Sequence, residues 1–171
     1  MTITITTIEA ADRIAAFASE GRLRRGTWHD KEAGREVACL LGAIHADIES
    51  PQHCPAHLMP DWMSELTVGL FDRLADADVA PVGQHYAAAM RAWSGLAAND
   101  WETVKTNHLI RCVEFALAKA EPQAKGLAVW PQVHAASQQV VAALRAGDSD
   151  LLAAARSAAR SAAEAARSAA R

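Results

Sequence analysis

Apolar residues recur at helical spacing along most of the chain. Thr6 and Glu9 have the spacing of a capping box, and the apolar stripe that follows predicts a helix over residues 7–20, which Gly21 ends. A second stripe predicts a helix over residues 36–48 and consists of Val37, Leu40, Leu41, Ile44 and Ile48.

The segment between these stripes and the next helix is rich in proline. Residues 50–60 read SPQHCPAHLMP, and the three prolines make this segment a stiff connector because each one fixes its own backbone angle. Asp61 then suits the start of a helix, which the stretch ADADVAPVG interrupts at residues 75–83. Further helices are predicted over residues 84–96, 101–119 and 131–146.

The C-terminal stretch from Asp148 has a composition of its own. Its arginines step along one helical face and are separated mostly by alanine, the residue with the highest helix propensity. We expect a helix over residues 148–171 whose alanine face packs on the preceding helix or on the same helix of another subunit. The predicted organisation is a helical domain at 1–147 followed by this helix. The predicted fold class is all-α, a compact bundle of six or seven helices with a possible short hairpin near residues 26–36.

Length, charge and cysteine content narrow the classes of protein. A chain of 171 residues with 51% hydrophobic residues can bury a core of its own. Its three cysteines are poor material for a disulfide framework, which favours a reducing cytoplasm. The sequence has neither a secretory start nor an apolar run of the ~20 residues that a membrane span needs.

Basic residues gather in two places although the formal net charge is −3. They lie in the segment RLRR at residues 22–25 and along the C-terminal helix, where residues 151–171 carry four arginines and one glutamate. Arginines on one face can bind phosphates or an acidic protein, and we favour a protein partner because no aromatic residues alternate with them. The candidate partner-binding residues are Arg22, Arg24, Arg25, Trp28, Arg156, Arg160, Arg167 and Arg171.

Two pairs of cysteine and histidine have spacings that zinc ligands use. Cys54 and His57 lie in the proline-rich segment, and His108 and Cys112 lie one turn apart on the predicted helix at 101–119. A helical wheel places the second pair on the inward arc, together with Trp101, Val104 and Phe115. Two thiolates and two imidazoles would make a closed, structural zinc site. The alternative is that these side chains fill space in a protein with no cofactor.

Cys54 also has two histidines beside it, His53 and His57, and this permits a cysteine-dependent enzyme as a further hypothesis. The sequence contains no HExxH, Walker or GxGxxG motif and no paired ExxH motifs.

Two stretches resemble known sequences. Residues 26–44, GTWHDKEAGREVACLLGAI, resemble a W…GR…CxLGA[IL] pattern of uncharacterised bacterial and phage domains. The stretch AARSAARSAA is similar to repeats at the ends of some hypothetical phage and bacterial proteins. Neither resemblance implies an activity.

The sequence therefore favours a small non-catalytic accessory or phage-type protein that binds a macromolecular partner through its helix faces. Self-association through the alanine face is possible, and nucleic acid is a less favoured partner than protein. The alternatives are a zinc-binding helical protein and a small cysteine-dependent enzyme.

Overall fold

The computed structural model describes residues 3–169, with side chains described as far as residue 164. These residues form mostly helix, as predicted, together with one short antiparallel hairpin. None of the described helices combines the length and apolarity that crossing a membrane requires. The elements are α1 (Thr7–Ser19), β1 (His29–Glu32), β2 (Arg35–Ala38), η1 (Pro51–His53), α2 (Asp61–Phe71), α3 (Asp76–Ala92), α4 (Ala98–Ala124), α5 (Trp130–Ala146) and α6 (Ser149–Ala169).

The chain divides into two compact units, Met1–Leu96 and Ala97–Arg171. Each unit has its own core. The predicted C-terminal helix, α6, belongs to the second unit together with α4 and α5.

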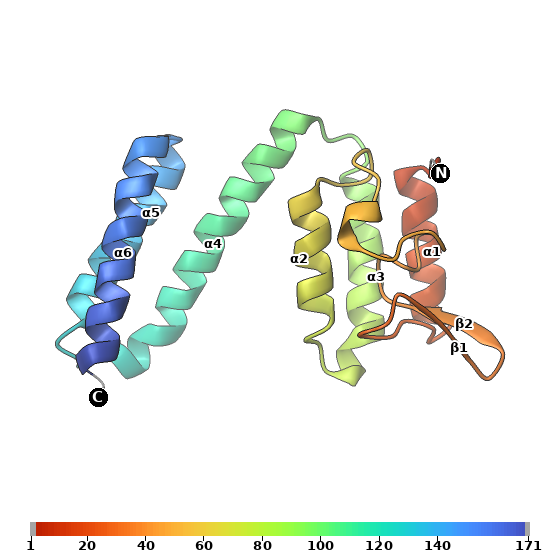
Figure 1. Ribbon diagram of the computed structural model, residues 1–171, viewed down its shortest axis with the longest axis horizontal. Coiled ribbons are helices and arrows are strands. Elements are labelled where there is room, and N and C mark those ends of the chain that lie inside the picture. Colours follow the sequence, from red (N-terminus) through yellow and green to blue (C-terminus); the bar gives the residue numbers. More distant parts are fainter. Residues whose placement is uncertain (1–2, 170–171) are drawn as a thin grey trace. The chain divides into compact units, whose positions relative to one another are not determined.

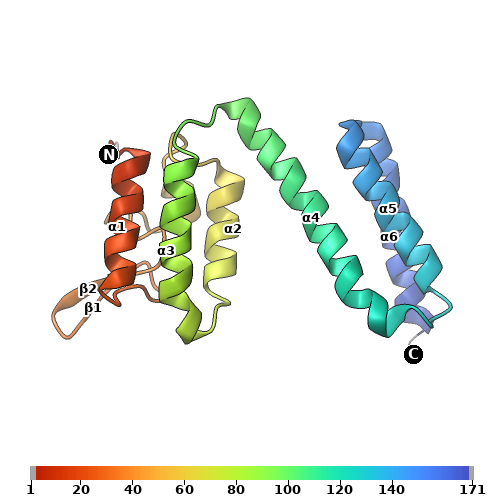
Figure 2. The ribbon, with the colours of Figure 1, turned by 180° about the vertical axis from the view of Figure 1, so that it is seen from behind.

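Helices α1 and α3 form the centre of the N-terminal unit. They pack side by side, and α3 lies between α1 and α2 in two opposite views (Figures 1 and 2). The predicted capping box at the start of α1 is confirmed, because Thr6 and Glu9 bond reciprocally. Gly83 of α3 is buried, and a Cβ at this position would lie 2.4 Å from Leu23 Cδ1, so the absent side chain makes room for Leu23.

The predicted helix over residues 36–48 is wrong. Residues 35–38 form strand β2, which pairs with β1 in the register His29↔Ala38 to Glu32↔Arg35, and turns follow it. All residues from Val37 to Ile44 are buried, so the apolar run carries no information on which face is exposed. A continuously buried segment can be strand, turn or helix, and periodicity does not separate these cases.

The predicted break at residues 75–83 is also wrong. Helix α3 begins at Asp76 and continues through Pro81 to Ala92. Its buried residues Val79, Gly83, Ala87 and Met90 fall on one helical face, while Pro81 is exposed. Burial of this face outweighs the cost of one proline near the helix start, where tertiary packing overrides local propensity.

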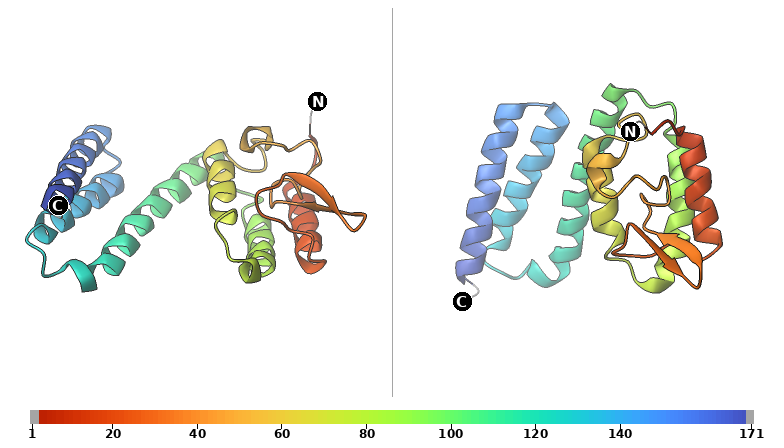
Figure 3. Two further views of the ribbon diagram at one scale, coloured as in Figure 1. Left: turned by 60° about the horizontal axis from the view of Figure 1, so that its bottom comes forward. Right: turned by 45° about the vertical axis from the view of Figure 1, so that its right-hand side comes forward.

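The C-terminal unit consists of three helices with small side chains at their contacts. Helix α6 packs along α5, which also contacts α4; Figure 3 shows the pairing of α5 and α6 in two further views. Ala155 and Ala162 of α6 are buried, and so are Ala136, Val141 and Ala143 of α5. Alanine buries little area per residue, so the core of this unit is made mostly of small side chains, with Ile110 and Val141 as larger buried residues.

Candidate functional site

Cys54 and His57 lie in the proline-rich segment of the N-terminal unit. The Cys54 side chain is buried, and this burial raises the pKa of its thiol to about 12. The His57 Nε2 atom lies 2.8 Å from the carbonyl oxygen of Ile5 and bonds the segment to the chain preceding α1. A buried thiol that resists ionisation is a poor nucleophile, so this geometry gives no support to the cysteine-enzyme hypothesis.

His108 and Cys112 lie one turn apart on α4, with Nε2 and Sγ separated by 3.4 Å. The predicted inward orientation is wrong for Cys112, Val104 and Phe115, which are exposed, whereas Trp101 and His108 are partly buried. The buried residue of α4 is Ile110. Contacts with α5 determine which face of α4 is buried. The apolar pattern in the sequence of α4 alone does not reveal this face.

The structure does not bring the four predicted zinc ligands together in one unit. Cys54 and His57 belong to the first unit and His108 and Cys112 to the second. Among the described residues, no three histidine, cysteine, aspartate or glutamate side chains are grouped closely enough to hold a metal ion. Zinc binding by these residues stays a prediction.

The three cysteines should differ strongly in reactivity. Cys112 is exposed, whereas Cys39 and Cys54 are buried, and burial raises the pKa of both buried thiols. At pH near 8 we expect iodoacetamide to modify Cys112 at least about tenfold faster than the other two. Peptide mass spectrometry after timed quenching measures this order, and Cys112→Ser should remove the fast phase. Fast labelling of Cys54 in the folded protein would contradict the buried placement.

The arginines of the RLRR segment bind carboxylates of their own unit. Arg24 pairs with Glu32 at 2.6 Å, and the guanidinium lowers the pKa of this carboxyl through its hydrogen bonds. Arg25 bonds Asp76 at the start of α3. These pairs hold the segment to the hairpin and to α3. They also neutralise the positive charges of Arg24 and Arg25, two of the predicted partner-binding residues.

Arg22 and Trp28 have structural contacts as well. The Arg22 guanidinium lies 3.6 Å from the centre of the Phe17 ring and pairs with Glu20 at 2.8 Å. Trp28 is partly buried, and its backbone carbonyl lies against Gly42. Binding of a partner by Arg22, Arg24, Arg25 and Trp28 stays a prediction.

Arg156 and Arg160 of α6 differ from the arginines of the RLRR segment in their surroundings. Both are exposed, and neither has an ion pair among the described side chains. They border a groove of about 640 Å³ within the C-terminal unit. The predicted Arg171 and the side chain of Arg167 lie outside the described residues. The other residues that line the groove are Val113, Ser137, Val140, Ala159 and Ala163.

Sequence reasoning missed the residues of α4 and α5 that line this groove. The valines Val113 and Val140 look like ordinary core positions of their own helices, and both are only half-buried. Their contribution depends on the placement of three helices, for which the sequence carries no local signal. The alanine face of α6 and the two arginines Arg156 and Arg160 were the features of the sequence that pointed to this region.

Comparison of the chain with family models, with curated proteins and with solved structures finds no match. The function of the groove is therefore inferred from the residues that line it.

Proposed function

We propose that the protein is a non-catalytic binding protein whose C-terminal unit docks an acidic amphipathic helix of a partner protein. The observation that carries this proposal is the groove lined by α4, α5 and α6, which combines four apolar residues with two arginines that have no ion pair among the described side chains. Helices that lie in apolar grooves are a recurrent mode of protein recognition.

The residues of α5 and α6 that line the groove are spaced by about one helical turn on each helix. Val140 is one turn from Ser137 on α5, and Ala159 is one turn from Ala163 on α6. A guest helix would place apolar side chains at i and i+3 or i+4 over these positions. The alanines allow a close approach of the guest backbone.

The charge of the border favours acidic side chains on the guest. Arg156 and Arg160 lie one turn apart, and each guanidinium offers donors that match a carboxylate. Elsewhere in the same unit Arg145 is occupied, since it pairs with Glu114 at 2.6 Å. Two arginines beside an apolar surface are complementary to a helix with apolar and acidic faces.

Other exposed apolar side chains also occur on this unit. Phe115 of α4 is 65% exposed, and Leu127 and Leu151 are more than a third exposed. Apolar surface beside a polar rim is typical of interaction sites. This distribution supports binding by the C-terminal unit and says nothing for catalysis.

Charge reversal of the groove border should abolish recognition of an acidic helix. The probe is a fluorescent peptide with apolar residues at i, i+4 and i+7 and glutamates beside them, titrated with the full-length protein by anisotropy. We expect Arg156→Glu together with Arg160→Glu to weaken binding at least about tenfold, because each lost charged hydrogen bond is worth roughly 1.5–3 kcal/mol. Added salt should weaken the wild-type complex.

The matched control is Arg73→Glu, which reverses an exposed charge of the N-terminal unit. It should bind the peptide like the wild type. A peptide with lysines in place of the glutamates should not bind. Equal binding of the acidic and basic peptides, or of the wild type and the double variant, would reject the proposal. A dimer in light scattering that the double variant lacks would show that a second copy occupies the groove instead.

A further inference from the structure

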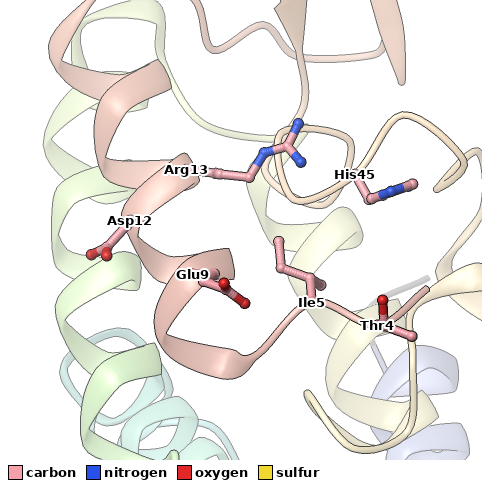
Figure 4. A pocket seen from close by; sticks show the side chains of 6 residues that line it. All are labelled: Thr4, Ile5, Glu9, Asp12, Arg13 and His45. Carbon is pink, nitrogen blue, oxygen red and sulfur yellow. The ribbon is translucent and has the colours of Figure 1, made fainter.

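A second hollow lies in the N-terminal unit, between the start of α1 and the loop that follows β2. Its volume is about 560 Å³, and Figure 4 shows its lining residues, Thr4, Ile5, Glu9, Asp12, Arg13 and His45. We propose that this hollow binds a small carboxylic acid that also carries a hydroxyl or amino group. The proposal concerns a different unit from the groove and is independent of the proposed function.

Arg13 supplies the positive charge of the hollow. Its guanidinium has no hydrogen bond or ion pair to any described residue, and in Figure 4 it extends toward the loop that carries His45. A free guanidinium presents paired N–H donors with the geometry of a carboxylate. Asp12, the neighbouring acid, points to the opposite side of the helix, where it pairs with Arg91 at 2.7 Å.

His45, from the loop that follows β2, also lines the hollow. Its Nδ1 atom accepts a hydrogen bond from the Asp47 N–H at 3.2 Å, so the neutral ring carries its hydrogen on Nε2. The Asp47 Oδ2 atom is buried without a hydrogen bond and lies 3.6 Å from Nδ1, where it would face the protonated ring. In both protonation states Nε2 is a donor.

Glu9 supplies a negative charge to the hollow. Its Oε2 atom accepts from the Thr6 N–H at 2.8 Å and from the Thr6 hydroxyl at 2.7 Å. These bonds lower the pKa of the Glu9 carboxyl, which therefore stays ionised. No hydrogen bond from a described residue uses Oε1, so this oxygen is free to accept a donor of a ligand.

The opposite charges of Arg13 and Glu9 define the class of ligand. An oxyanion fits beside Arg13 and His45, while a hydroxyl or ammonium group fits beside Glu9, which would repel a second anion. The half-buried Ile5 side chain offers an apolar wall for a short aliphatic part. Small α-hydroxy acids and α-amino acids combine these groups.

The proposal is tested by amide chemical shifts of the full-length protein during titration with L-lactate, L-serine, acetate and methylammonium. We expect lactate or serine to shift resonances of Thr4–Glu9, Arg13 and His45, and to bind at least about tenfold tighter than acetate or methylammonium. A response to serine alone identifies the amino-acid class, and a response to lactate alone identifies the hydroxy-acid class.

Two variants decide whether the hollow is the site. Arg13→Gln removes the charge and should weaken binding at least about tenfold, whereas Arg73→Gln, an exposed arginine away from the hollow, should bind like the wild type. The proposal is overturned if none of the four probes shifts these resonances, if acetate binds as tightly as serine and lactate, or if Arg13→Gln binds unchanged.

Discussion

Replacing Gly42 with alanine is expected to lower the free energy of unfolding by about 3 kcal/mol or more. A Cβ at this position would lie 2.1 Å from the Trp28 carbonyl oxygen and 3.2 Å from His29 Cε1. The Trp28 carbonyl cannot withdraw freely, because the next residue begins β1 and the preceding Thr27 carbonyl accepts the Cys39 N–H at 2.9 Å. The added methyl group therefore forces the hairpin and the loop apart.

Gly69→Ala is the matched control for this substitution. Gly69 lies inside α2, and a Cβ there would meet nothing within 4 Å. Alanine is the better helix former by roughly 0.8–1 kcal/mol, so this variant should be more stable than the wild type. Urea unfolding followed by circular dichroism measures both changes. An unchanged midpoint for Gly42→Ala would contradict the close packing of the loop on Trp28.

Phe71→Ala should destabilise the N-terminal unit by about 3–5 kcal/mol. Phe71 ends α2 and is 2% exposed, one of the largest fully buried side chains among the described residues. Its removal loses the transfer free energy of the ring and leaves a cavity that the surrounding helices fill only in part. Denaturant unfolding with tryptophan fluorescence gives the change in stability.

The same substitution at Phe115 provides the comparison. Phe115 is 65% exposed on α4, so its removal should change stability by less than about 0.5 kcal/mol. A large loss of stability for Phe115→Ala would mean that this ring is buried in solution, and its assignment to an exposed surface would then be wrong. A small loss for Phe71→Ala would contradict the core of the N-terminal unit.

The elements that could be predicted from the sequence are those with local signals. The capping box of Thr6 and Glu9 fixed the start of α1, and Gly147, in the left-handed conformation, ends α5 where the sequence placed its end. The alanine-rich C-terminal helix followed from propensity alone. In each case neighbouring residues determine the backbone, so no knowledge of distant contacts was needed.

The elements that could not be predicted depend on contacts between distant residues. The segment after β1 has helical spacing, but Ala38 pairs with His29, and its N–H bonds the Arg22 carbonyl at 3.1 Å. The continuation of α3 through Pro81 depends on packing against α1. Local rules gave the wrong element at both places because the deciding partners lie elsewhere in the chain.

The same distinction applies to the candidate sites. Arg25 looked free in the sequence, yet it bonds Asp76, which lies 51 residues away. Arg156 and Arg160 were selected because they share a helix face, and they lie beside apolar residues with no ion pair in the part of the chain whose side chains the structure describes. The hollow with Arg13 and His45 had no sequence signal, since its residues come from separate segments without a motif.

The packing of α6 on α5 through alanine tolerates a change in the length of α6. Its sequence is built largely from four-residue units such as Ser157–Arg160, and four residues turn an α-helix about 40° beyond one full turn. Duplication or loss of one unit therefore rotates the following residues only slightly, and small side chains still meet α5. The helix can thus change in length by one such unit while it keeps its neighbour.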